Sequence, residues 1–217
     1  MTLAEENYLK TIFHLERKLK SEVSTNALAE RMQTRASSVT DMMQKLADKK
    51  MLVYKKYKGV QLTEKGKKAA AYVVRKHRLW EVFLVDKLKF HWDEVHEIAE
   101  QMEHINSVEL IKRLDAFLGH PDFDPHGDPI PDKDGNIKKA EKRLLSELIK
   151  NQIGICVGVK ESSPEYLQYL DKKKISIGTK INVLGKEFFD GSMMIQVGRD
   201  QFFVSKQIAE NLYVQTN

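Results

Sequence analysis

Histidine and glutamate side chains recur at helical spacing in the middle of the chain. Six residues form the pattern: His77, Glu81, His96, Glu100, Glu103 and His104. At about 100° per residue, the last four would share one face of a single helix, within an arc of about 100°. With a neighbouring helix that carries the first two, they offer six nitrogen and oxygen ligands. Such a set suits manganese or ferrous iron and has room for one ion or two.

Two other interpretations of these residues compete with a metal site. A single His-x-x-x-Glu pair is common on solvated helix faces, but two pairs and an additional Glu-His dipeptide favour metal binding. The stretch His96-Glu97-Ile-Ala-Glu100 lacks the second histidine of a zinc protease, and there is no Gly-rich phosphate loop, so we expect no enzyme. Some residues stand outside the spacing and are interpreted as structural: His14, His91, His120, His126 and Cys156.

Composition and charge narrow the class of protein. The 217 residues are 41% hydrophobic and 31% charged, as in ordinary globular proteins. Residues 1–70 hold 15 Lys and Arg against 8 Asp and Glu, a net charge of +7, which indicates a module that binds a polyanion. A single cysteine excludes an intramolecular disulfide and a multi-cysteine metal site. Neither a membrane span nor a signal peptide is recognisable, so we expect a cytoplasmic protein.

The basic segment has the element order of a winged helix-turn-helix. Apolar periodicity predicts a helix over residues 5–19, a second helix capped by Ser24 or Thr25, and a third over residues 37–49. Short strands at residues 51–54 and 60–63 flank a lysine-rich turn. A helix of this kind fits the major groove of double-stranded DNA while the hairpin lysines reach phosphates.

The third helix and the wing carry the candidate DNA contacts. Five residues near the start of the helix offer hydrogen-bonding groups to base edges: Arg35, Ser37, Ser38, Thr40 and Asp41. Three wing lysines would contact phosphate without reading sequence: Lys55, Lys56 and Lys58.

The rest of the chain is helical first and then rich in strands. Helices are predicted from Thr63 toward Leu84, from Asp93 past His104, and over residues 108–118. Residues 121–135 are dense in Pro, Gly and Asp and are interpreted as a loop or linker. Strands at residues 153–159, 179–184, 192–197 and 201–204, with a helical turn at 164–170, then indicate a small barrel.

Several stretches of the chain together resemble the metal-dependent repressors related to the diphtheria toxin repressor and the manganese transport regulator. They are Glu6-Asn-Tyr-Leu-Lys-Thr-Ile, Ala29-Glu-Arg-Met, Ser37-Ser-Val-Thr, Leu62-Thr-Glu-Lys-Gly66, Arg75-Lys-His-Arg-Leu79, Glu103-His104 and Pro125-His-Gly-Asp-Pro-Ile-Pro131. The C-terminal third resembles the SH3-like (FeoA-like) domain of the same family. The resemblance therefore covers the first 135 residues by motif and the remainder by strand pattern.

This resemblance implies a homodimer whose metal-bound form binds a palindromic operator and represses metal-uptake genes. By position, Glu100, Glu103 and His104 match the primary metal site, whose first-helix ligand falls at Asn7. The ancillary site corresponds to His77, Glu81 and His96, with Glu161 as an additional ligand from the C-terminal domain. Glu100 stands where iron-sensing relatives have a cysteine, which favours Mn(II), with Fe(II) as the second choice. Lys10, one turn after Asn7, adds a positive charge nearby.

The expected fold is therefore mainly α with a small β domain. It comprises a winged helix-turn-helix DNA-binding domain at 1–70, a helical dimerisation and metal-binding domain at 71–137, and a linker with an SH3-like (FeoA-like) domain at 138–217. No membrane and no small organic substrate are expected as partners. The alternative is a winged-helix regulator that senses an organic ligand, with the His and Glu residues not regulatory.

Overall fold

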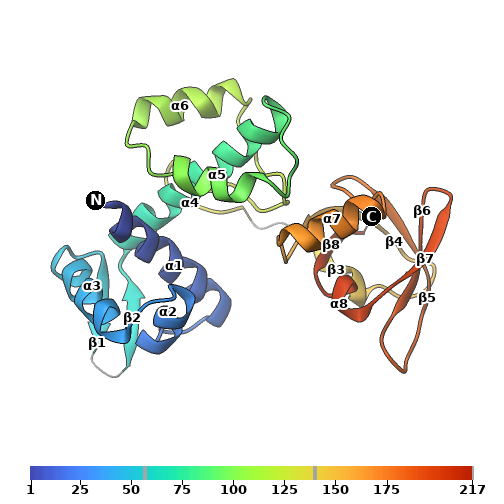
Figure 1. Ribbon diagram of the computed structural model, residues 1–217, viewed down its shortest axis with the longest axis horizontal. Coiled ribbons are helices and arrows are strands. Elements are labelled where there is room, and N and C mark those ends of the chain that lie inside the picture. The colour runs from blue at the N-terminus through green and yellow to red at the C-terminus, as the bar shows by residue number, and fades with distance from the viewer. Residues whose placement is uncertain (56–57, 139–140, 217) are drawn as a thin grey trace. The chain divides into compact units, whose positions relative to one another are not determined.

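The computed structural model describes residues 1–55, 58–138 and 141–216 (Figure 1). The helices are α1 (Leu3–Leu19), α2 (Thr25–Arg31), α3 (Ala36–Asp48), α4 (Glu64–Asp86), α5 (Val95–Met102), α6 (Val108–Phe117), α7 (Pro164–Lys172), α8 (Lys206–Ala209) and the 3₁₀ turn η1 (Leu145–Glu147). The strands are β1 (Leu52–Lys55), β2 (Gly59–Leu62), β3 (Arg143–Leu144), β4 (Ile153–Val159), β5 (Lys180–Lys186), β6 (Met193–Val197), β7 (Asp200–Val204) and β8 (Leu212–Gln215).

The N-terminal head has the order of elements that the sequence predicts. Thr2 closes a capping box on α1, and the Ser24 side chain accepts a hydrogen bond from the Ala27 amide to begin α2. Strands β1 and β2 pair antiparallel, with Leu52 opposite Leu62. Apolar side chains from all three helices and both strands form one core. The winged helix-turn-helix is thus confirmed in its helices and in the hairpin.

Helix α4 begins directly after the wing and contributes to the core of the head. The Thr63 hydroxyl accepts a hydrogen bond from the Gly66 amide at 3.1 Å, as expected of a capping residue. A Cβ at Gly66 would lie 1.8 Å from the Met51 carbonyl oxygen, so only glycine allows the helix to start so close to the hairpin. Ala70 and Val74 are buried in the core of the head. The domain boundary that the sequence predicts between residues 70 and 71 therefore falls inside one continuous helix.

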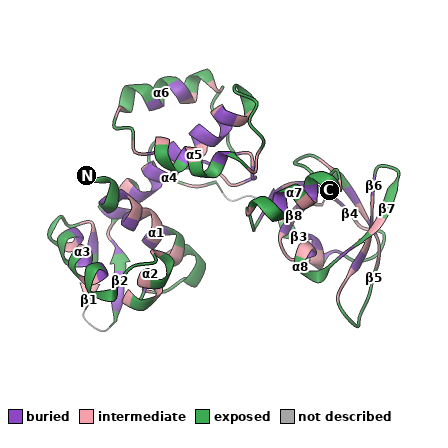
Figure 2. Cartoon of the chain, viewed as in Figure 1, coloured by how far each residue is buried: buried purple, intermediate pink, exposed green. Residues whose placement is uncertain are grey.

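Helix α5 is shorter than the sequence indicates. It begins at Val95 and ends at Met102, so Glu103 and His104 lie in the turn that follows and not on the helix itself. The prediction of one helix continuing past His104 was therefore wrong. Helix α6 follows, and Figure 2 shows it largely exposed, with Ile111 and Leu114 as its buried side chains.

The Pro-rich segment after α6 is a folded loop and not a simple linker. Asp124 Oδ1 accepts hydrogen bonds from the amides of His126 and Asp128, both at 2.9 Å, which builds an Asx turn. An isolated β-bridge joins Phe123 to Pro129. Both Asp124 and His126 are buried. The interpretation of this segment as a loop was correct, but its dense turn residues hid the burial of two polar side chains.

The C-terminal domain is an antiparallel sheet in the order β3-β8-β4-β5-β6-β7, packed around one apolar core that includes α7. The four predicted strands and the helical turn are confirmed, but β3, β8 and α8 were not predicted. Cys156 is buried in β4, and burial raises the pKa of its thiol to about 11. The cysteine therefore has the structural character that the sequence suggests.

The Pro-rich loop contacts this sheet at β4. The His126 carbonyl accepts a hydrogen bond from the Val159 amide at 2.9 Å. Gly127 has a φ of +80°, and a Cβ there would lie 2.0 Å from the Val157 carbonyl oxygen, so the approach requires glycine. Trp92, which precedes α5, packs against the apolar core of the sheet and donates its indole N–H to Asp171 at 3.1 Å. These contacts lie within one of the two compact units into which the chain divides.

No helix in the described part of the chain combines the length and the apolar character needed to cross a membrane.

Candidate metal centre and nucleic-acid interface

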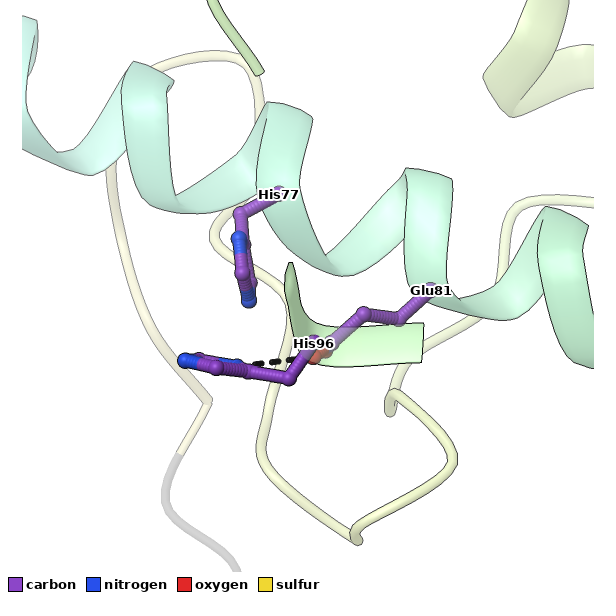
Figure 3. Close-up of side chains that lie close together, drawn as sticks. All are labelled: His77, Glu81 and His96. Carbon is purple, nitrogen blue, oxygen red and sulfur yellow. Dashed lines mark hydrogen bonds and ion pairs between the residues drawn. The ribbon is translucent and has the colours of Figure 1, made fainter. Parts of the chain in front are cut away.

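Helices α4 and α5 bring three predicted ligands together. His77 and Glu81 lie one turn apart on α4, and His96 lies on the first turn of α5. Figure 3 shows the three side chains converging, with the His96 Nδ1 atom 3.4 Å from Glu81 Oε1. One potential ligand atom from each lies within 4.8 Å of the others. Glu81 and His77 are buried, whereas His96 is exposed.

Two residues of the Pro-rich loop extend this group. Glu81, Asp124 and His126 also offer ligand atoms within 4.8 Å of one another, and all three are buried. The His126 Nε2 atom lies 2.8 Å from the Trp92 carbonyl oxygen, so it carries the proton and Nδ1 faces Glu81 Oε1 at 3.7 Å. Burial alone would lower the pKa of His126, but the Glu81 hydrogen bond and the Glu81 and Asp124 charges raise it above its ordinary value.

We call His77, Glu81, His96, Asp124 and His126 the Glu81 cluster. Its donors are imidazole nitrogens and carboxylate oxygens, which suit first-row divalent metals. Sequence reasoning missed Asp124 and His126, since they follow no helical period. The Asp124-Pro-His126 spacing, which overlaps the start of the Pro-His-Gly motif, is the signal that could have indicated them.

The residues expected at the primary site already contact other side chains of the chain. Glu103 is buried, and its Oε2 atom accepts hydrogen bonds from Lys10 Nζ and His77 Nδ1, both at 2.6 Å. Lys10 Nζ also lies 3.7 Å from Glu100 Oε1. We call Lys10, His77, Glu100 and Glu103 the Glu103 cluster. Burial opposes ionisation, but the His77 hydrogen bond and the Lys10 charge hold the pKa of Glu103 below its usual value.

His104 and Asn7 lie at the edge of this region. The Nδ1 atom of His104 lies 2.8 Å from Oε2 of the buried Glu6, and Lys76 Nζ lies 3.6 Å from the same oxygen. Glu6, adjacent to the expected ligand Asn7, is thus the α1 residue that contacts His104. Asn7 itself is half-buried. Within the described residues, no group of three potential ligands includes Glu100, Glu103 or His104.

The C-terminal residue Glu161 is exposed, and its carboxylate accepts a hydrogen bond from the Ser163 amide at 3.0 Å. The ligand groups found among the described residues do not include it. Its role as a metal ligand stays a prediction.

The start of α3 presents the expected polar surface. Arg35 is the N-cap residue of the helix, and Arg35, Ser37, Ser38 and Asp41 are all exposed. Thr40 is half-buried, and its hydroxyl donates to the Ala36 carbonyl at 2.9 Å. This end of α3 therefore carries several exposed groups capable of contacting bases.

The wing carries exposed lysines. Lys58 is exposed, and Lys55 forms an ion pair with Glu22 at 3.2 Å. Lys56, also expected to contact phosphate, lies outside the described residues.

Two further lysines connect α3 to α1. Lys45 and Lys49 contact Oε1 of the buried Glu5 at 3.0 and 2.7 Å. The Lys49 hydrogen bond outweighs burial and, with Lys45, lowers the pKa of Glu5 to about 2. Ion pairs thus fix the candidate recognition helix to α1.

Comparisons with known proteins agree with this architecture. Residues 1–60 match the model of the iron-dependent repressor N-terminal DNA-binding domain, and residues 63–132 match that of the iron-dependent repressor metal-binding and dimerisation domain. Residues 143–216 match the FeoA domain.

Curated relatives match parts of the chain. A probable metal transport system membrane protein of Chlamydia trachomatis is 51% identical over 70 residues, which are 32% of this chain and 16% of that protein. The iron-dependent repressor IdeR of Mycobacterium bovis is 36% identical over 126 residues, 58% of this chain and 54% of IdeR. The matched part of the chain thus spans about half of IdeR and much less of the chlamydial protein.

A solved structure matches nearly the whole chain. A manganese-dependent transcriptional repressor in complex with manganese is 34% identical, with a TM-score of 0.86 over 98% of this chain and 100% of the other. The structure of the manganese regulator SloR is 31% identical, with a TM-score of 0.75 and full coverage of both chains. With both repressor-domain models and the FeoA model matched in order, the chain belongs to the family of iron- and manganese-dependent repressors related to the diphtheria toxin repressor.

Proposed function

We propose that the protein is a metal-dependent transcriptional repressor, which binds double-stranded operator DNA as a homodimer when a divalent metal is bound. The observation that carries the proposal is that α4 belongs to two functional regions. Its first half contributes Ala70 and Val74 to the core of the DNA-binding head, and its second half carries His77 and Glu81. A metal ion bound by these ligands would therefore act on a helix that also forms part of the core of the head.

The Glu81 cluster is the proposed metal site. His77, Glu81 and His96 are its ligands, and Asp124 and His126 lie close enough to contribute. A bound divalent cation would supply positive charge to the buried Glu81 carboxylate. The His77 Nδ1–H donates a hydrogen bond to the Glu103 carboxylate, so Nε2 presents the lone pair that a metal ligand needs. The nitrogen and oxygen donors favour Mn(II) or Fe(II) in a cytoplasmic protein.

DNA recognition uses the head in two ways. Arg35, Ser37, Ser38 and Asp41 contact base edges from the exposed end of α3, with Thr40 at its half-buried side. Lys55 and Lys58 contact phosphate. A homodimer places two such heads on a palindromic site, and the largely exposed α6 supplies apolar surface for the contact, including Val108 and Phe117 at 74% and 63% exposure. Linkage requires that DNA strengthens metal binding by the factor by which metal strengthens DNA binding.

The decisive experiment measures DNA binding by the full chain with Mn(II), anaerobic Fe(II), Zn(II) or a chelator. Duplexes selected from random sequence in the presence of Mn(II) serve as the probe, because the operator sequence is part of the question. We expect His96→Ala to abolish the metal stimulation. His120→Ala is the matched control, since His120 is an exposed histidine paired with Asp115 outside the Glu81 cluster. Metal-independent DNA binding that responds to an organic ligand would instead support the alternative regulator.

A further inference from the structure

Lys10 lies where a cation would be expected, next to the carboxylates of Glu100 and Glu103. Its ammonium nitrogen lies 2.6 Å from Glu103 Oε2, 3.3 Å from His77 Nδ1 and 3.7 Å from Glu100 Oε1. The Lys10 side chain is 13% exposed and that of Glu103 is 1% exposed. A short lysine–carboxylate contact at this depth is a charge-assisted hydrogen bond shielded from water, not a surface ion pair.

The neighbouring donors are engaged in the same manner. His104 Nδ1 contacts Glu6 at 2.8 Å, and the ammonium of Lys76, a fully buried side chain, lies 3.6 Å from the same carboxylate. Two lysine charges therefore stand against three carboxylates, those of Glu6, Glu100 and Glu103. The lysine side chains of this region therefore offset most of the negative charge of its carboxylates.

A divalent ion does not fit this donor set as it stands. An ion bound to Glu103 Oε2 would lie within a few ångströms of the Lys10 ammonium, and like charges at that distance in a partly buried site repel strongly. It would also have to displace the shortest hydrogen bonds of Glu103. Asn7, the neutral residue at the position of the first-helix ligand, adds no charge to offset this cost.

We propose that Lys10 is a built-in cation of the Glu103 cluster, so that this region is held together by an ammonium group and takes no metal, and divalent metal binds at the Glu81 cluster alone. The inference rests on the proposed function only in its choice of the Glu81 cluster as the metal site. One consequence is that α1 stays bonded to the turn after α5 whether or not metal is present. A second consequence is that the positive charge of Lys10, and not a shortage of carboxylate ligands, keeps divalent metal out of this region.

The test is a Mn(II) titration of the full chain without DNA, by calorimetry and by electron paramagnetic resonance of free Mn(II). Lys10→Ala should bind one more Mn(II) per chain than the wild type, with an affinity at least about tenfold above any residual wild-type binding there. Lys10→Arg keeps the positive charge and should bind no additional ion. Lys18→Ala, which removes an exposed lysine from the same helix, should match the wild type.

Adding Glu103→Gln to Lys10→Ala should remove the additional ion, which locates it. Equal stoichiometry and affinity in the wild type and Lys10→Ala would overturn the proposal, as would a gain in Lys10→Arg.

Thermal unfolding gives a second readout should the alanine variant fold poorly. In chelator, Lys10→Ala and Lys10→Gln should unfold at lower temperature than the wild type, and Mn(II) should raise their Tm by more than it raises the wild-type Tm. An equal or smaller rise in both would contradict the proposal. A wild type that binds no metal at all would refute the proposed function, whereas a gain of one ion in Lys10→Ala would still support the role of Lys10.

Discussion

In the Glu81 cluster two imidazoles face the carboxylate, with His96 Nδ1 at 3.4 Å and His126 Nδ1 at 3.7 Å from Glu81 Oε1. In the Glu103 cluster a lysine ammonium lies at 2.6 Å from the carboxylate. An imidazole can lose its proton near neutral pH and become a metal ligand, whereas an ammonium has no lone pair to offer. Two clusters with similar carboxylates, which share His77, are thus suited to opposite tasks: one to exchange a metal ion, the other to bind helices together.

The largest effect should come from the carboxylate of the Glu81 cluster. Glu81→Gln keeps the shape of the side chain but removes the charge that faces His96 and His126. We expect Mn(II) affinity to fall by about 100-fold or more, with the stimulation of DNA binding lost. The control is Glu97→Gln, which makes the same change at an exposed glutamate on the neighbouring helix α5. Calorimetry and a DNA-binding titration check both, and an unaffected Glu81 variant would remove the distinction between the clusters.

The same change in the other cluster should act on stability and leave the metal response intact. Glu103→Gln removes the partner of Lys10 and His77 in a buried site, so we expect the free energy of unfolding in chelator to fall by about 2 kcal/mol. Urea denaturation measures this. Mn(II) should still stimulate DNA binding by the variant. Loss of that stimulation would return Glu103 to the primary metal site that the family resemblance implies.

A third ion-paired group joins Glu5 to Lys45 of α3 and to Lys49 at the C-cap of that helix, and it contains no histidine. Its pH dependence therefore sharpens the comparison. The pKa of Glu5 lies at about 2, below its ordinary value of 4.5. The pair therefore stabilises the head fully above about pH 4.5 and loses its contribution as pH falls toward 2. We expect wild-type stability to decrease over that interval by about 1 kcal/mol more than that of Glu5→Gln, since the lysines are half exposed. Parallel curves of stability against pH for the two proteins would contradict this.

The smallest effect concerns an exposed lysine, in contrast to the half-buried Lys10. Lys58→Ala should weaken binding to all DNA sequences a few-fold and reduce the salt dependence by about one unit of slope. Arg35→Ala should change which sequence is preferred. Binding to selected and random duplexes at several salt concentrations separates the two. A change of sequence preference in the Lys58 variant would show that the wing reads bases.

Sequence reasoning succeeded where the signal is local. The helices of the head and four strands of the C-terminal domain follow from apolar periodicity, and His77, Glu81 and His96 follow from helical spacing. It failed where contacts between residues far apart in the chain determine which side chains meet. Lys10 and Glu103 are 93 residues apart in the chain, and no pattern joins them. The end of α5 at Met102 was missed because Glu103 and His104 continue the helical period of charged residues without being helical.

The β elements and the Pro-rich loop show the same limit. Strand β8 is short and pairs with β3 and β4, far away in sequence, so its four residues carry little signal of their own. Asp124 and His126 lie among turn residues that indicate exposure, and their burial depends on contacts with distant segments, such as the stacking of His126 on Trp92 and the approach of Gly127 to β4.

The continuity of α4 also constrains how proteins of this architecture can be recombined. A one-residue insertion between Val74 and His77 would rotate the ligands by about 100° around the helix axis while leaving both apolar faces chemically intact. Such a protein would fold its head and retain its histidines, but the histidines would lie on a different side of the helix from the one they occupy now. A chimera that exchanges the head must therefore conserve the exact number of residues from the wing to Glu81.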